Sequence, residues 1–296
     1  MALGAAALAW TFVRADLPVP GGDLGSLPAA PHVDGLVLRR LPTATIASQH
    51  GFSVRGAPIT APFTSAMVAF VVQHPRGTVL IDAGMGSRGR EHVSTVPYLM
   101  QAIVDLQMRQ GTADGLRAGG IAPAGLWGVI LTHGHWDHVS GLQDLPGVPV
   151  WMTTEEQAYV AEDGGGLLYR QIDAERPVDV RTLTFPDGPY GPFAASWDVF
   201  DDGSLVVLPL PGHTPGSVAV LVNGAERTLF VGDTSWTQEG VAWPAEKPWV
   251  TRRMVDHDPA GVREQLVFLH RMVAANPGLV VVPAHDERVH ARVPTL

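Results

Sequence analysis

The chain has 296 residues, of which 46% are apolar and 17% are charged, and this composition suits a folded globular protein better than a disordered one. The formal net charge is −9 and no run of lysine or arginine occurs, so we expect no nucleic-acid partner, because phosphate backbones require a basic surface. Cysteine is missing, which excludes disulfides, thiolate metal ligands and cysteine nucleophiles and leaves histidine, carboxylate and water for any metal.

The N-terminal stretch MALGAAALAWTFV is uncharged and mostly apolar, but its 13 residues fall short of the roughly 20 that cross a bilayer. We therefore expect no stable membrane span. The stretch favours a strand or helix of the domain over the remnant of an export signal, so a cytoplasmic location is favoured and export stays open.

Residues 1–35 include a segment rich in proline and glycine, and we predict that they form an N-terminal arm over the surface. Residues 17–62 could serve a homodimer. Because glycine and proline are spread along the whole chain and mark no linker, we predict a single domain over residues 1–296.

The first half of the chain has the pattern of strands interrupted by one helix. Apolar runs with β-branched residues predict strands at 35–41, 65–73, 78–84 and 125–132. Apolar residues at helical spacing predict a helix over 94–110, with Ser94 as its cap.

The second half begins with a strand at 148–154 and a helix capped by Thr153 or Thr154. Further strands are predicted at 204–210, 217–222, 227–233 and 278–286, with a long helix between the last two that has Asp258 as its N-cap. The stretch 164–203 is predicted to be an irregular lid or substrate loop. It carries the aromatic residues Tyr169, Phe185, Tyr190, Phe193, Trp197 and Phe200.

Four polar side chains directly follow the strand at 125–132, namely His133, His135, Asp137 and His138. Side chains two positions apart in an extended segment point the same way, so His133 and His135 can reach one metal together. Asp137 and His138 lie where the chain must turn and can face a second metal. Three histidines and an acid within six positions are improbable as a chance surface turn, so the pattern predicts a metal-binding cluster.

The same arrangement recurs downstream, where His213, Asp233 and His285 each follow a predicted strand. Ligands of open α/β sheets bind at the carboxyl ends of strands. Taken singly, His213 or His285 is as readily a capped or core histidine as a metal ligand. Together with the first cluster they make five histidines and two aspartates at four strand ends, which is a ligand set for two metals.

The motif HGHWDH at 133–138 resembles the H-x-H-x-D-H motif of the metallo-β-lactamase superfamily, and the downstream succession of histidine, aspartate and histidine is similar to the rest of that pattern. The resemblance implies an α/β fold, a four-layer αβ/βα sandwich of two mixed sheets flanked by helices. It implies that His133, His135 and His213 hold one metal, that Asp137, His138 and His285 hold the other, that Asp233 bridges both and that Asp82 supports the ligands.

The chemistry of these ligands agrees with two divalent ions per chain, zinc first, with iron, manganese or cobalt as alternatives. Two such ions about 3.5 to 4 Å apart lower the pKa of a bridging water, and the resulting hydroxide attacks a carbonyl or phosphoryl centre. Asp137 and Asp233 are the predicted catalytic carboxylates, and Asp233 could shuttle the proton.

Within the superfamily, the chain looks like the small lactonases and organophosphate hydrolases, with acyl-homoserine lactonases as the leading comparison. We therefore predict opening of a small, uncharged or hydrophobic lactone or ester. The alternatives are hydrolysis of an organophosphate triester and, from another class, a mono-iron oxidoreductase such as a persulfide dioxygenase.

The sequence departs from the lactonase pattern at one position, because Trp236 stands where quorum-quenching lactonases usually carry a tyrosine. An indole N–H can donate a hydrogen bond but cannot accept one. Trp136 and Trp236 are the predicted pocket residues. With Trp243, Trp249 and the aromatics of 164–203, they predict a roomy apolar pocket beside the metals.

Overall fold

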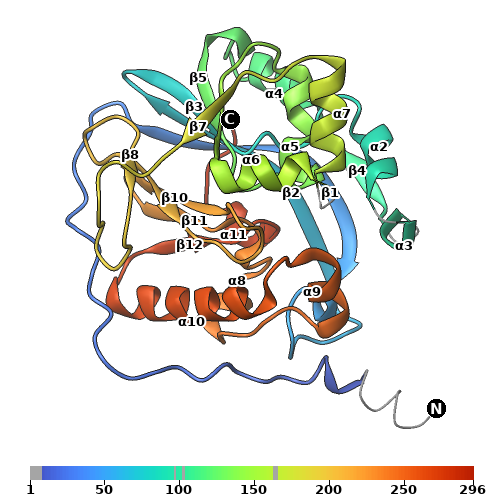
Figure 1. The fold of residues 1–296 in the computed structure, drawn as a ribbon, viewed down its shortest axis with the longest axis vertical. Coiled ribbons are helices and arrows are strands. Elements are labelled where there is room, and N and C mark those ends of the chain that lie inside the picture. Colours follow the sequence, from blue (N-terminus) through green and yellow to red (C-terminus); the bar gives the residue numbers. More distant parts are fainter. Residues whose placement is uncertain (1–8, 97, 102–103, 163–165) are drawn as a thin grey trace.

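The computed structural model describes residues 9–96, 98–101, 104–162 and 166–296, and its two β-sheets face each other (Figure 1). The larger sheet has seven strands in the order β4-β1-β2-β3-β5-β6-β7. Their bounds are β1 Val37–Gln49, β2 Pro62–His74, β3 Gly77–Ile81, β4 Leu106–Met108, β5 Leu126–Ile130, β6 Val150–Thr153 and β7 Val180–Leu183. The first four strands of this order, β4 to β3, pair antiparallel, whereas β3, β5, β6 and β7 pair in parallel.

The smaller sheet has five strands in the order β12-β11-β10-β9-β8. Their bounds are β8 Trp197–Asp198, β9 Leu205–Pro209, β10 Val218–Asn223, β11 Arg227–Phe230 and β12 Val280–Val282. Only β11 and β12 pair in parallel among these strands. Both sheets are therefore mixed.

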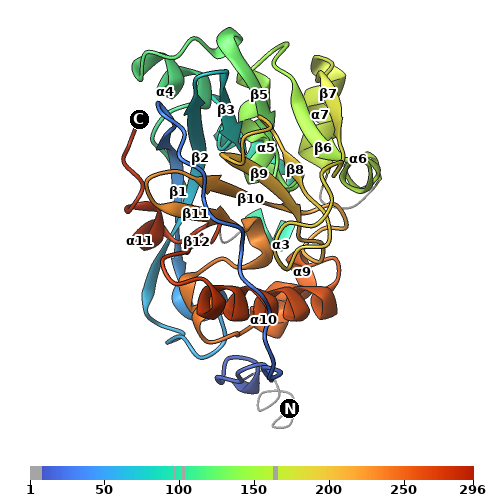
Figure 2. The same cartoon turned by 90° about the vertical axis from the view of Figure 1, so that its left-hand side faces the viewer.

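Helices cover the outer face of each sheet (Figures 1 and 2). The larger sheet is flanked by α4 Thr112–Ala118, α5 Trp136–Val139, α6 Thr154–Ala161 and α7 Leu167–Glu175, and the smaller by α8 Gln238–Ala242 and α10 Pro259–Ala275. Four short helices complete the described set: α2 Gly89–His92, α3 Tyr98–Gln101, α9 Trp249–Val255 and α11 Glu287–His290. The architecture is the predicted α/β sandwich of four layers.

Alternation along the strands creates three apolar layers between these four. In β9, Leu205 and Val207 pack between the two sheets, whereas Val206 and Leu208 pack against α10, because successive side chains of a strand point to opposite faces. A third core joins the outer face of the larger sheet to α4, α6 and α7. Both sheets are buried on both faces, which explains why their strands read as nearly continuous apolar runs.

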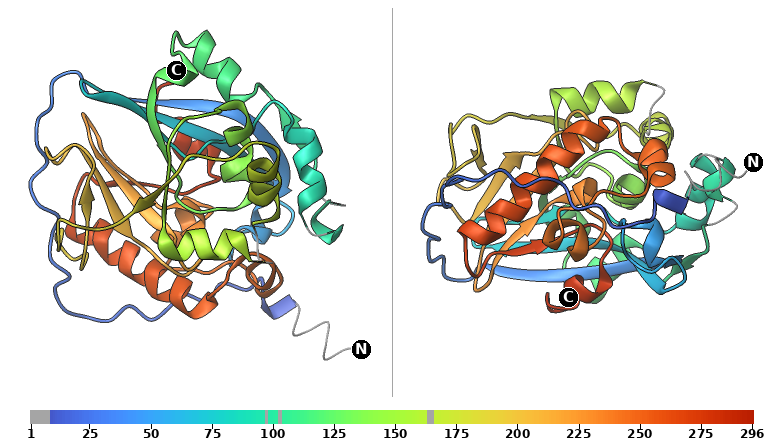
Figure 3. Two further views of the ribbon diagram at one scale, coloured as in Figure 1. Left: turned by 45° about the horizontal axis from the view of Figure 1, so that its top comes forward. Right: turned by 90° about the horizontal axis from the view of Figure 1, so that it is seen from below.

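The N-terminal arm runs across the outer face of α10, as seen from the side in Figure 2 and from below in Figure 3. The Leu27 side chain enters the core between α10 and the smaller sheet, and its backbone N–H donates to Asn276 Oδ1 at 2.8 Å. Residues 1–8 lie outside the described residues, so the strand or helix expected there stays a prediction. Among the residues described, no helix combines the length and hydrophobicity needed to cross a bilayer.

The helix predicted over 94–110 is wrong. The described part of this segment holds a 3₁₀ turn at Val93–Thr95, the single turn α3 and the edge strand β4, which pairs antiparallel with β1. Helical spacing alone could not anticipate that pairing, because β1 lies about 60 residues earlier and offers a free edge.

The stretch 164–203 is not irregular throughout, because it contains α7, β7 and β8, and its role as a lid or substrate loop stays a prediction. Its aromatic side chains fill the cores instead of lining a substrate pocket. Tyr169 packs beneath the larger sheet, Phe185, Trp197 and Phe200 pack between the sheets, and Tyr190 and Phe193 pack toward α10.

Candidate metal centre

The carboxyl ends of five strands converge on one place between the sheets. Strand β3 delivers Asp82, β5 leads into His133 and His135, the loop after β9 carries His213, and β11 and β12 are followed by Asp233 and His285. The helix α5 begins directly after His135 and carries Asp137 and His138 in its single turn. All seven candidate ligands therefore come together although they are spread over more than 150 positions of the chain.

The seven side chains form two groups, within each of which the potential ligand atoms lie no more than 4.8 Å apart. The first contains His133, His135, His213 and Asp233, and the second contains Asp137, His138 and His285. In the first group, His213 Nε2 lies 2.8 Å from His135 Nδ1 and 3.4 Å from Asp233 Oδ2. Donor atoms around a tetrahedral zinc at about 2.1 Å are spaced by roughly 3.4 Å, which is the scale observed here.

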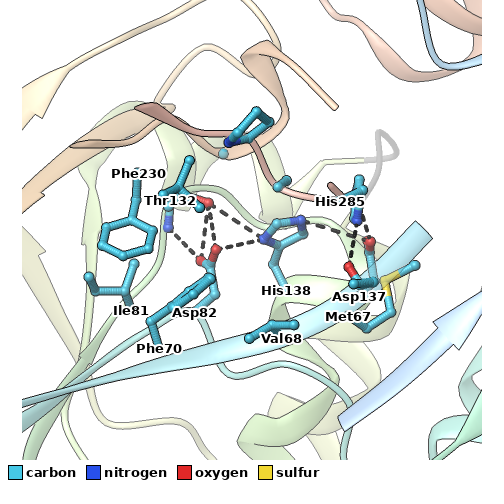
Figure 4. A pocket seen from close by; sticks show the side chains of 15 residues that line it. Met67, Val68, Phe70, Ile81, Asp82, Thr132, Asp137, His138, Phe230 and His285 are labelled. Carbon is cyan, nitrogen blue, oxygen red and sulfur yellow. Dashed lines mark hydrogen bonds and ion pairs between the residues drawn. The ribbon is translucent and has the colours of Figure 1, made fainter. Parts of the chain in front are cut away.

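The second group lines a small cavity between Asp82 and His285 (Figure 4). His285 Nε2 lies 3.4 Å from Asp137 Oδ2, and His138 Nε2 lies 3.8 Å from the same oxygen. The apolar walls of this cavity come from the inter-sheet core, including Phe70, Ile81 and Phe230.

Asp233 lies between the two groups and divides its two carboxylate oxygens between them. Its Oδ1 is 3.1 Å from His285 Nε2 and 3.3 Å from His138 Nε2. Its Oδ2 is 3.4 Å from His213 Nε2 and 3.9 Å from His133 Nε2. One oxygen thus faces each group, which is the arrangement that a bridging carboxylate needs.

Each imidazole turns one nitrogen toward the centre and binds a neighbouring group through the other. The partners are Thr132 Oγ1 for His133 Nδ1 at 3.2 Å, Tyr159 Oη for His135 Nε2 at 3.0 Å, Asp82 Oδ2 for His138 Nδ1 at 2.7 Å, Asp256 Oδ1 for His213 Nδ1 at 2.8 Å and Ala66 O for His285 Nδ1 at 3.1 Å. Such outer contacts fix the ring orientation and the tautomer of metal-binding histidines.

Asp82 adopts a left-handed backbone conformation with φ 57°, which is costly for a residue other than glycine. Its Oδ1 accepts a hydrogen bond from the backbone N–H of Thr132 at 2.7 Å, and the hydroxyl of Thr132 donates to Oδ2 at 2.9 Å. These contacts join the ends of β3 and β5 and direct the carboxylate at His138 (Figure 4). The strain is thus offset by a hydrogen-bonded carboxylate that supports a candidate ligand.

The electrostatics of the first group favour neutral histidines. Burial lowers the pKa of His133 and of His135 well below the ordinary value, and the neighbouring imidazoles act in the same direction. Neutral imidazole is the form that binds a metal, so these two rings need not release a proton first.

Carboxylates dominate the second group. Burial acts to lower the pKa of His138, but Asp82 and Asp137 outweigh it and hold this pKa well above the ordinary value. Burial acts to raise the pKa of Asp233, but His285 and the other histidines outweigh it and hold this pKa well below the ordinary value. Asp233 is therefore an anion surrounded by imidazoles.

Three buried atoms at the centre test whether these residues fit a metal. His133 Nε2, His138 Nε2 and Asp233 Oδ1 are buried and have no hydrogen-bond partner within the described part of the chain. Buried polar atoms are nearly always paired, so three unpaired ones that face a common point need an explanation. Metal ions supply it, because lone pairs of imidazole and carboxylate are what zinc and related ions bind.

Four further residues at this centre had no signal in the sequence. Glu156, Tyr159, Lys247 and Asp256 contact the loops or rings of the candidate ligands. They belong to no motif and lie 13 or more positions from the residues they support. Only the composition holds a hint, because Lys247 is the single lysine of the chain and is buried.

The tryptophans divide into two groups. Trp136 and Trp236 are both partly buried. Trp136 packs against two apolar cores, whereas Trp236 lies at the centre and its Nε1 donates to Asp233 Oδ2 at 2.8 Å. Trp243 packs against a separate small core, and Trp249 is 53% exposed. The prediction of a roomy pocket walled by all four tryptophans and the aromatics of 164–203 is therefore wrong, because most of these rings fill cores elsewhere.

Comparisons with known proteins agree with this geometry. The chain is 29% identical over 244 residues to a probable metallo-hydrolase of Mycobacterium tuberculosis, covering 73% of each chain. It is 27% identical to the N-acyl homoserine lactonase AttM of Rhizobium johnstonii, covering 73% of this chain and 80% of that one.

A solved N-acyl homoserine lactone hydrolase, with the product N-hexanoyl-L-homoserine bound at its catalytic metal centre, has a similar fold. The TM-score is 0.69 at 15% identity, with 88% of this chain and 96% of that chain covered. These relatives support a metal-dependent hydrolase. The family model of the metallo-beta-lactamase superfamily matches residues 66–285, which include all seven candidate ligands, and the chain belongs to that superfamily.

Proposed function

We propose that this protein is a hydrolase that uses two divalent metal ions to open a lactone or another carboxylic ester. The observation that carries the proposal is the position of Asp233, whose two oxygens face two separate groups of candidate ligands. The second group of Asp137, His138 and His285 offers ligands for a second ion beside the first.

We assign the ions to side chains from the chemistry of the donors. His133, His135 and His213 would hold one ion, Asp137, His138 and His285 the other, and Asp233 both. When bound, such ions lower the pKa of a water molecule and polarise the carbonyl group under attack. Zinc suits this mixture of imidazole and carboxylate best, and iron, manganese and cobalt also suit it.

The residues of the chain would orient the reaction. Asp82 and Asp256 hold the rings of His138 and His213, and Asp137 and Asp233 are the carboxylates nearest to the reacting groups. Trp136 and Trp236 present apolar surface beside them, which favours a small, uncharged or hydrophobic substrate. The relatives that are named as N-acyl homoserine lactonases make acyl-homoserine lactones the first substrates to test.

Trp236 argues for testing more than one substrate class. Its indole N–H is already donated to Asp233, so it is not free to orient a substrate carbonyl in the way expected of the tyrosine in lactonases. An organophosphate triester is therefore the alternative substrate to test.

A hydrolysis screen tests this proposal. Zinc-loaded protein is assayed against acyl-homoserine lactones, simple lactones, aryl esters and a phosphotriester, and we expect the highest kcat/KM with a lactone or ester. Asp233→Ala should lower that rate at least a hundredfold. The control is Asp114→Ala, which removes an exposed carboxylate of α4 and should leave the rate unchanged. No turnover of any ester, or equal rates in Asp233→Ala and wild type, would refute the proposal.

A further inference from the structure

The single lysine of the chain lies against the proposed metal centre. Lys247 follows α8 and precedes α9, and its side chain is only 3% exposed. A buried ammonium group is costly unless it is paired and hydrogen-bonded, so the partners of Lys247 indicate its role.

One of its contacts reaches a candidate ligand, and another reaches the carboxylate that binds a candidate ligand. Lys247 Nζ donates to the backbone oxygen of Asp233 at 2.8 Å and to Asp256 Oδ1, also at 2.8 Å. The same Asp256 oxygen accepts the hydrogen bond of His213 Nδ1 at 2.8 Å. Lys247 Nζ also lies 5.4 Å from the centre of the Trp236 ring. One ammonium group therefore connects the backbone of the proposed bridging carboxylate with the ring of a histidine ligand.

The Asp256 carboxylate depends on this lysine. Its side chain is 2% exposed, and its side-chain partners in the described chain are Lys247 and the ring of His213. Without a cation, a buried carboxylate loses the interaction that offsets its desolvation. The pair of Lys247 and Asp256 carries no net charge, so it can hold the His213 ring without adding negative charge to the centre.

The two groups of candidate ligands are supported differently. His138 of the second group also binds a carboxylate, Asp82, but the other partners of Asp82 are the backbone N–H and hydroxyl of Thr132, and no lysine or arginine is among them. Lys247 reaches the second group only through the backbone oxygen of Asp233, so a change at Lys247 should act more strongly on the first group than on the second.

We propose that Lys247 is a positioning residue that, through Asp256, fixes His213 Nε2 toward His133 and His135 and thereby sets the metal affinity of that group far more than the affinity of the other group. This inference rests on the proposed two-metal centre. It adds a function for the lysine, and it predicts that the two metal sites respond unequally to one substitution.

The experiment uses metal binding instead of turnover as its readout. Metal-stripped wild type, Lys247→Met, Lys247→Arg and Asp256→Asn are titrated with Co²⁺ against a competing chelator, and the visible spectrum follows each binding event. We expect Lys247→Met and Asp256→Asn to weaken one of the two events by about 10- to 100-fold, the range for losing a group that supports a metal ligand. The other event should stay within about threefold of wild type, and Lys247→Arg should recover much of the loss.

Arg55→Met is the matched control, because Arg55 is also a buried cation with a carboxylate partner. Its side chain is 6% exposed and its Nη1 lies 3.1 Å from Glu246 Oε1, and its other hydrogen bonds in the described chain go to the backbone oxygens of Val13 and Trp10. This variant should lower the unfolding temperature and leave both binding events unchanged.

Each outcome decides the proposal. Wild-type affinity for both ions in Lys247→Met overturns it, as does an equal weakening of both events, which would show a general structural role. If Lys247→Met does not fold, Asp256→Asn decides by the same criterion, because it keeps the lysine and the shape of the carboxylate. A wild-type chain that binds no metal overturns the two-metal centre and this inference together, whereas two tight events in every variant overturn the inference alone.

Discussion

Trp236 is the residue at which the sequence departs from the lactonase pattern, and the structure gives it a defined partner. Its Nε1 donates to Asp233 Oδ2 at 2.8 Å, and its ring meets the His285 ring edge-on, with the ring centres 5.6 Å apart. The indole N–H therefore orients the proposed bridging carboxylate and stabilises its negative charge by a hydrogen bond. A tyrosine could do the same, but its hydroxyl could also accept a hydrogen bond.

Trp236→Phe tests this role. The substitution keeps an aromatic ring beside the centre and removes the hydrogen bond to a charged carboxylate, an interaction worth about 1.5 to 3 kcal/mol. We expect kcat/KM for the best ester to fall about tenfold or more, with the metal content of the protein measured in parallel. Trp243→Phe is the control, because Trp243 packs against Val54, Ala57 and Ala245 away from the centre. Equal kcat/KM values for Trp236→Phe and wild type would contradict the role.

At the scale of elements, Glu156 connects the two loops that carry the first group of candidate ligands. It lies in the first turn of α6, and its Oε1 accepts from the backbone N–H of Gly134 at 2.6 Å, between His133 and His135. Its Oε2 accepts from Thr214 Oγ1 at 2.6 Å and from the backbone N–H of Gly216 at 3.2 Å. Burial raises the pKa of Glu156 to about 6, although these three donors oppose the rise.

The packing around Gly134 supports the same connection. A Cβ at this position would lie 2.1 Å from Val160 Cγ1 of α6, so the loop after β5 approaches the helix more closely than any other residue type permits. The helix α6 thus serves as the element that fixes both loops.

Glu156→Ala should destabilise both the fold and the metal site. It leaves three buried donors without an acceptor, and we expect the free energy of unfolding to fall by about 3 kcal/mol. The affinity for the first metal should fall about tenfold, because the loops of His133, His135 and His213 lose their connection. Urea unfolding and chelator competition measure the two effects. Glu155→Ala, an exposed change in the same helical turn, should alter neither, and an unaltered metal affinity in Glu156→Ala would contradict the connecting role.

At the scale of the whole molecule, most strands could be predicted from the sequence. The contacts between residues far apart in the sequence could not. Apolar runs placed β2, β3, β5, β6, β9, β10, β11 and the long helix α10 close to their observed bounds, because local periodicity reports a face that must be buried, whereas β1 continues to Gln49, well beyond its predicted end at residue 41. The strand β4 was missed because it forms only by pairing with β1, and β7 and β8 were missed inside a stretch that composition marked as irregular.

The seven candidate ligands were accessible to sequence reasoning because each follows a strand, and strand ends of an α/β sandwich converge. Their assignment to two metals remains a proposal. Glu156, Lys247 and Asp256 were not accessible, because their positions at the centre depend on how α6 and the segment between α8 and α10 pack, which no local pattern encodes.

His290 gives the fold a pH dependence. It is fully buried in α11, its Nε2 donates to Pro283 O at 2.7 Å, and burial lowers its pKa to about 4 from an ordinary value of 6.5. Because the unfolded chain binds the proton more readily, this contribution to stability is complete above about pH 6.5 and is lost as the pH falls toward 4.

The effect of His290 should be measurable between pH 7 and pH 5, where the pKa difference costs the fold about 2 kcal/mol. His290→Gln keeps a donor for Pro283 O and cannot be protonated in this range. We expect its free energy of unfolding, measured in urea at several pH values, to depend less on pH than that of wild type by this amount. His32→Gln, at an exposed position, should retain the wild-type slope, and a wild-type slope in His290→Gln would contradict the prediction.

The central claim is that this chain holds two metal ions through one set of seven side chains. Its most direct test is a calorimetric titration of the metal-stripped protein with Zn²⁺, combined with elemental analysis of protein purified without added metal. We expect wild type to bind two equivalents of Zn²⁺ per chain. Asp233→Ala should bind no more than one equivalent tightly, because Asp233 faces both groups. A single equivalent in wild type, above all one iron accompanied by oxygen consumption, would contradict it.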